Sequence, residues 1–112
     1  MKCPDIGQIK FSQTSINAIN DIRNRQLLSS ALLATMGAGT IFNIFTLGSS
    51  LPETSFSVYS TDFKAMADAM ASVPAITREA ISRVSFQAQY DAKGYKEQQF
   101  WEAVREGCSV YR

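Results

Sequence analysis

Apolar residues recur at helical spacing in the first quarter of the chain. Ile16, Ile19 and Ile22 follow one another at intervals of three, a spacing that places them on one face of a helix. Ser12 or Thr14 precedes this pattern and is a suitable N-terminal cap. The pattern therefore predicts a long N-terminal helix over about 14–36, with a continuation to 47 left open.

The polar side of this pattern is lost in the charge-free segment, the stretch 26–52, which contains no Asp, Glu, Lys or Arg. It is long enough for a membrane helix, which needs about 20 predominantly apolar residues. Within it, Ser30, Ala34 and Ala38 recur at intervals of four, a small-residue spacing that lets membrane helices approach closely. Asn43, polar at membrane depth, would then bond to a partner helix. This first interpretation is a single membrane span.

The flanking charges give that span an orientation. Arg23 and Arg25 lie just before the charge-free segment, and Glu53 is the first charge after it. Because basic residues favour the cytoplasmic side, the N-terminus would be cytoplasmic and residues 53–112 would lie outside. The predicted localisation is therefore the membrane, with the cytoplasm as the alternative.

Other features of the charge-free segment favour a buried element of a soluble fold. Gly37 and Gly39 sit in its middle and are typical of a turn. Thr40–Leu47 is rich in β-branched and aromatic residues, as strands are. It would pair with Thr54–Ser60, where Phe56 and Val58 alternate with polar residues. The sequence leaves both interpretations open.

The last half of the chain has shorter patterns. Apolar residues at helical spacing predict helices over 61–73, 75–83 and 95–107, with Gly107 as the C-terminal cap of the last. From Val84 to Tyr90 apolar and polar residues alternate, which predicts a strand. This half should thus be mainly helical.

Two fold classes follow from these patterns. The first is a mainly α protein in three parts: an N-terminal amphipathic segment (1–25), the candidate transmembrane span (26–52) and a small C-terminal helical domain (53–112). The alternative is a soluble α+β fold with strands near 40–47, 54–60 and 84–90.

Composition excludes several kinds of site. The chain has no histidine, so it has no Ser-His-Asp or Cys-His pair and no histidine metal ligand. Cys3 and Cys108 are the only cysteines and lie near opposite ends. We therefore expect no catalytic residues, no metal and no cofactor. With a net charge of +1 and basic residues interleaved with acids, we also expect no nucleic-acid partner. No small-molecule substrate is evident.

Some residues of the last predicted helix are candidates for contact or chemistry. Phe100 and Trp101 are candidate anchors for a partner, although burial against the preceding helices is favoured. Glu97, Glu102 and Glu106 share the helix with basic residues. For these acids a solvated charged face is favoured over acid–base catalysis.

The functional hypothesis is a small non-catalytic accessory or assembly subunit that packs against a partner protein or a second copy. Its predicted interaction residues are Ser30, Ala34, Ala38, Asn43, Phe100 and Trp101. The alternative is a soluble protein-binding module, an inhibitor or adaptor of the kind that phages and plasmids encode. A third hypothesis, an enzyme that uses carboxylates alone, has the least support.

Overall fold

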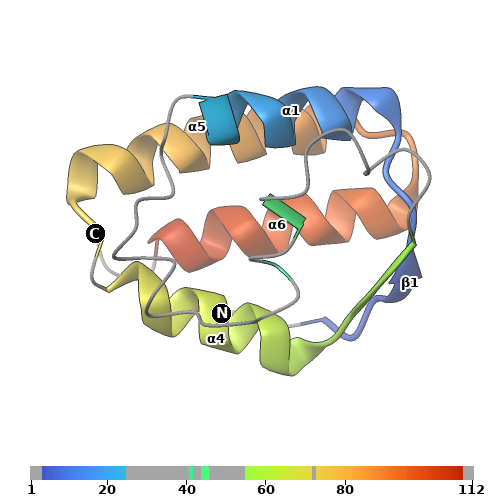
Figure 1. Cartoon of the computed structure of the whole chain (residues 1–112), viewed down its shortest axis with the longest axis horizontal. Coiled ribbons are helices and arrows are strands. Elements are labelled where there is room, and N and C mark those ends of the chain that lie inside the picture. The colour runs from blue at the N-terminus through green and yellow to red at the C-terminus, as the bar shows by residue number, and fades with distance from the viewer. Residues whose placement is uncertain (1–3, 25–40, 42–43, 46–54, 72, 110–112) are drawn as a thin grey trace.

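The computed structural model describes residues 4–24, 41, 44–45, 55–71 and 73–109. Figure 1 shows the helices and strands of this part of the chain. In chain order they are β1 (Gly7–Ile9), α1 (Gln13–Asn24), β2 (Phe56–Val58), α4 (Ser60–Met70), α5 (Ala75–Asp91) and α6 (Tyr95–Ser109).

Helix α6 is central to the arrangement. It packs against α5 on one side and against α4 on another, and α1 packs on α5. In Figure 1 the pair α1 and α5 lies above α6, and α4 lies below it. The protein is therefore mainly helical with a small sheet. The helices predicted over 61–73 and 95–107 are confirmed as α4 and α6, with shifted ends.

The sheet joins the start of the chain to its middle. Strands β1 and β2 are antiparallel, with Ile9 opposite Phe56 and Gly7 opposite Val58. Gly7 has a φ of 75°, which favours glycine because a Cβ is strained in that region. The predicted strand near 54–60 is confirmed, but its predicted pairing with Thr40–Leu47 is wrong. Its partner is β1, and residues 41, 44 and 45 are helical.

The strand predicted over 84–90 is also wrong, because α5 continues through it to Asp91. The helix predicted over 75–83 is thus only the first half of α5. Its buried face has helical spacing but consists largely of small or polar side chains: Arg78, Ile81, Ser82, Ser85 and Ala88. Phe86 and Tyr90 point outward, 57% and 79% exposed. The alternating apolar residues therefore include two exposed aromatic residues beside Val84 and Ala88, so they do not form one buried face.

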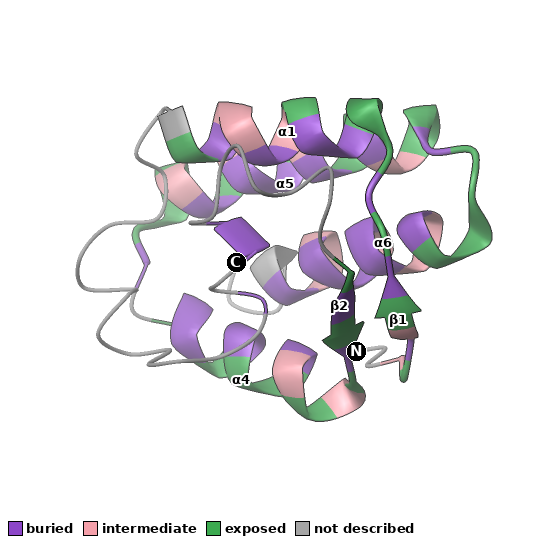
Figure 2. Cartoon of the chain, turned by 45° about the vertical axis from the view of Figure 1, so that its right-hand side comes forward, coloured by how far each residue is buried: buried purple, intermediate pink, exposed green. Residues whose placement is uncertain are grey.

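The described residues form a hydrophobic core where the helices face one another (Figure 2), and Phe100 belongs to it. The Phe100 ring contacts those of Phe11, Phe45, Phe63 and Trp101, with centroids 5.0, 6.4, 5.9 and 5.1 Å away. Aromatic pairs at such distances add to the stabilisation from burial. The core thus joins residues from both ends of the chain and from its middle.

Part of the charge-free segment lies in this core. Ile41, Ile44 and Phe45 are buried there, and the Phe45 ring is 6.1 Å from that of Trp101. Among the helices of the described residues, none has the length and apolar character needed to cross a bilayer. The membrane interpretation therefore finds no support in the described part of the chain.

Gly107 does not cap α6, contrary to the prediction, because the helix runs on to Ser109. It packs closely against α4 instead. A Cβ at this position would lie 2.5 Å from the terminal methyl carbon of Met66. The glycine thus allows the end of α6 to approach α4.

Candidate functional site

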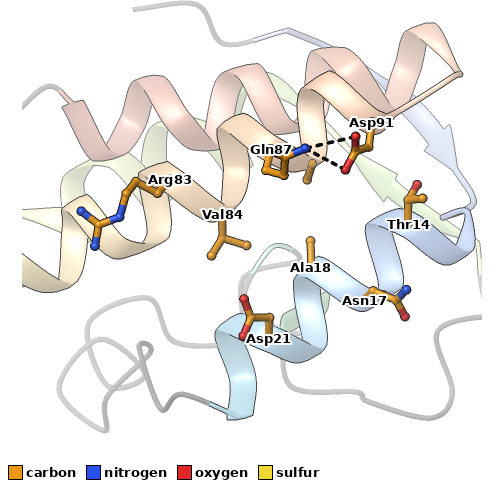
Figure 3. A pocket seen from close by; sticks show the side chains of 9 residues that line it. Thr14, Asn17, Ala18, Asp21, Arg83, Val84, Gln87 and Asp91 are labelled. Atoms are coloured by element: carbon orange, nitrogen blue, oxygen red, sulfur yellow. Dashed lines mark hydrogen bonds between the residues drawn. The ribbon is translucent and has the colours of Figure 1, made fainter.

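A groove runs between α1 and α5, with a volume of about 490 Å³. We call it the α1/α5 groove. Figure 3 shows side chains of the two helices facing each other across it. It is lined by Thr14, Asn17, Ala18 and Asp21 from α1 and by Arg83, Val84, Gln87, Ala88 and Asp91 from α5. Its volume lies within the ~300–1,000 Å³ of typical ligand sites.

The floor of the groove is apolar and continues the core. Ala18 and Val84 are partly buried and pack against the hydrophobic core, and Ala88 belongs to it. Because alanine and valine are short, the two helices leave room between them. An apolar side chain placed here would extend the core outward and lose its contact with water.

The rim of the groove is polar. On α5, the Gln87 side-chain amide donates to both carboxylate oxygens of Asp91, at 3.2 and 3.1 Å. On α1, the Gln13 amide donates to the Asn17 side-chain oxygen at 2.8 Å. The rim thus offers amide and carboxylate groups for hydrogen bonds. An apolar floor beneath a polar rim is an arrangement suited to binding.

A second feature is the aromatic surface, made by Phe86, Tyr90 and Tyr95. Their side chains are 57%, 79% and 73% exposed. The Arg105 guanidinium lies 5.6 Å from the centre of the Phe86 ring, within cation–π range. Two shallow hollows of about 330 and 150 Å³ adjoin this surface and share Gln89 and Gln98. Exposed aromatic groups beside arginine and amides are typical of protein contact surfaces.

Glu97 is buried, so its predicted place on a solvated charged face is wrong. It is 8% exposed. Its carboxylate accepts hydrogen bonds from the Ser12 backbone N–H (2.8 Å), the Ser12 hydroxyl (2.7 Å) and the Ser15 hydroxyl (2.5 Å). The Trp101 indole N–H donates to the Ser15 oxygen at 3.0 Å. Glu97 thus ties the start of α1 to α6 and serves as a structural anchor.

The interaction residues predicted from the charge-free segment, Ser30, Ala34, Ala38 and Asn43, lie outside the described residues. Phe100 and Trp101 are fully buried in the core, as the sequence favoured. They offer no surface to a partner in this fold, and their role as contact residues stays a prediction. The predicted residues are therefore not brought together as one site.

The described residues also bear on metals. No group of three or more Cys, Asp and Glu side chains in that part of the chain is arranged to hold a metal ion. The side chains of Cys3 and Cys108 lie outside the described part of the chain.

Sequence reasoning missed the α1/α5 groove. Ala18 is adjacent to the apolar stripe of α1, but one alanine in the sequence is weak evidence for a groove. Val84 and Ala88 fall in the predicted strand over 84–90, in which Gln87 would lie on the opposite face. Only a helical reading of 84–91 places Val84, Gln87, Ala88 and Asp91 on one side of a helix.

Comparisons with known proteins add no relative from which a function is transferred. No protein-family model, no curated protein and no solved structure matches this chain.

Proposed function

We propose that this chain is a non-catalytic protein-binding module that receives part of a partner's helix in the α1/α5 groove. The observation that carries the proposal is the pair Ala18 and Val84. Both are apolar, partly exposed and packed on the core at the floor of the groove. Covering them with an apolar side chain of the partner would gain free energy, about 25 cal/mol for each Å² removed from water.

The walls of the groove favour a helix over an extended peptide. Both walls are helices, whose backbone N–H groups are already bonded within each helix. The groove therefore offers no free strand edge to which an extended chain could add. A third helix can instead lay a row of side chains between α1 and α5, as helices pack on one another.

The polar rim would set the orientation of the partner helix. Asn17 lies on one wall and Gln87 on the other, and each can bond to a polar side chain that flanks the buried apolar one. Charges of both signs line the groove, with Arg83 and Asp91 both on α5. A partner with charges of both signs beside its apolar residue is the best match.

A photo-crosslinking residue placed at Asn17 tests the proposal in cells that naturally produce the protein. Asn17 is exposed on the rim, so the substitution leaves the core intact. The matched control is the same residue at Lys64, which is exposed on α4. We expect a discrete protein adduct from position 17 and none from position 64. Equal adducts from both positions, or none from either, contradict the groove as a binding site.

Ala18→Arg sharpens this test by filling the groove with a long charged side chain. We expect it to reduce the adduct from position 17 at least tenfold, as loss of a buried contact of about 1.4 kcal/mol or more would. Ala65→Arg, on the exposed side of α4, is the matched control and should leave the adduct unchanged. Circular dichroism checks that both variants fold. An adduct that survives Ala18→Arg in a folded protein overturns the proposal.

Self-association through the aromatic surface is a second candidate function. Three exposed aromatic side chains in one region are more than scattered surface residues usually supply. Sedimentation equilibrium of the wild type and of Tyr90→Ser tests this candidate. A dimer that is weakened by Tyr90→Ser supports this candidate, and a monomer at high concentration rejects it.

A further inference from the structure

Helix α5 starts without a cap among the described residues. Pro74 stands at the N-cap position, no side chain bonds to the first turn, and the turn contains no acid. Helix α4 differs, because Asp62 accepts from the Tyr59 N–H at 2.9 Å and Asp5 accepts from the Ser60 N–H at 2.7 Å. The first N–H groups of any helix have no acceptor within the helix. At α5 these donors are therefore available to a ligand.

Arg78 is the second and independent observation. Its side chain is only 8% exposed, and within the described part of the chain its Nε has no hydrogen-bond partner. A buried polar atom without a hydrogen-bond partner costs free energy, so such atoms are normally paired. The buried Nε of Arg78 thus lacks an acceptor.

The place of Arg78 in the helix joins the two observations. It is the fourth residue of α5, and its side chain shares a face with Pro74 and Ala75, one turn earlier. Because helical side chains lean towards the N-terminus, we expect the guanidinium to lie near the first turn. A cation there also faces the positive end of the helix dipole. Glu79, the nearest acid on α5, is exposed and about 100° further around the helix.

We propose that the first turn of α5 binds an oxyanion of the size of phosphate. The backbone N–H groups of Ala75, Ile76 and Thr77 would hold it from the helix end, as helix N-termini hold phosphates. Arg78 would bind it from the inner face through its planar set of N–H donors. Donors that approach from two directions match a tetrahedral group with several oxygens better than a flat carboxylate. The site is separate from the α1/α5 groove and does not depend on it.

The test is thermal unfolding of the full chain in rising inorganic phosphate, against sodium chloride and sodium acetate at equal ionic strength. We expect phosphate to raise the Tm by about 5 °C at concentrations far above its Kd. A rise of the same size in chloride means screening of charge and overturns the proposal. A rise in acetate equal to that in phosphate means a carboxylate site and overturns it as well.

Arg78→Met should abolish the phosphate response, and without phosphate its Tm should equal or exceed that of the wild type. Arg83→Met removes an exposed arginine from the same helix and is the matched control, with the response retained. Should Arg78→Met fail to fold, Ala75→Asp gives an independent answer. It places a carboxylate three residues before Arg78, so it should raise the Tm without phosphate and remove the response. A phosphate response that persists in either folded variant overturns the site.

Discussion

The first turns of α5 and α6 each contain a charged residue. The two residues are buried to the same degree but differ in their hydrogen bonds. Glu97 is the third residue of α6 and Arg78 the fourth residue of α5, and each is 8% exposed. Glu97 accepts three hydrogen bonds from two serines. The Arg78 Nε has no partner among the described residues.

The sign of the charge makes the contrast larger. The N-terminal end of a helix is positive, so it stabilises the Glu97 carboxylate and opposes the Arg78 guanidinium. Burial of the Glu97 carboxylate at the start of α6 therefore contributes to the stability of the fold. At the α5 start the helix dipole opposes the buried guanidinium, an arrangement that our proposal explains by the binding of an anion. Three substitutions test this comparison.

Glu97→Ala should have the largest effect. It leaves the buried Ser15 hydroxyl and the Ser12 donors without their acceptor, and a buried donor left unsatisfied costs more than the net hydrogen bond is worth. We expect the free energy of unfolding to fall by about 3 kcal/mol, measured by urea denaturation. Glu79→Ala, an exposed glutamate on α5, is the control. Equal effects of the two variants would mean that Glu97 is no anchor.

Ser15→Ala should have an intermediate effect. The Ser15 hydroxyl donates to Glu97 and accepts from Trp101, so its loss leaves the indole N–H unpaired and removes one of the two hydrogen bonds that Glu97 Oε2 accepts. The same denaturation should show a loss of about 1–2 kcal/mol. The control is Ser85→Ala, also buried, because the Ser85 hydroxyl only donates to the Ile81 carbonyl of its own helix at 2.7 Å. A cost for Ser85→Ala as large as that for Ser15→Ala would contradict a special role of this network.

Arg78→Met should have the smallest effect and the opposite sign. In a buffer without phosphate or sulfate it removes a guanidinium whose buried Nε has no acceptor and keeps most of the side-chain volume. We expect the free energy of unfolding to rise by about 1 kcal/mol, while Arg83→Met changes it little. A clear loss of stability in Arg78→Met would show that the guanidinium supports the fold, and the contrast with Glu97 would disappear.

Patterns within single helices could be read before the structure. The stripe of Ile16, Ile19 and Ile22 on α1 and that of Phe63, Met66 and Met70 on α4 are both buried. Such stripes can be read from a short stretch of sequence, because every third or fourth residue of a helix lies on the same face. The strand Phe56–Val58 could also be predicted, since the alternation of apolar and polar residues is visible within a short stretch of sequence.

The same reasoning failed for α5, and the reason is physical. Its outward side contains Phe86 and Tyr90, while the face towards the core uses Ser82 and Ser85. Small polar side chains can be buried where helices approach closely and their hydroxyls bond within the helix, as Ser85 does. The exposed Phe86 and Tyr90 then take part in the apolar pattern, and a period of two imitates a strand.

The sequence by itself determined where the amphipathic helices α1, α4 and α6 form and that no histidine chemistry takes place, because composition and local periodicity decide both. Only the tertiary structure decided the partner of β2, the burial of Glu97 and the groove between α1 and α5. Each of these depends on residues far apart in the chain, as Ser12 and Glu97 are. No local pattern specifies which distant groups meet, since that follows from how all the helices pack around Phe100.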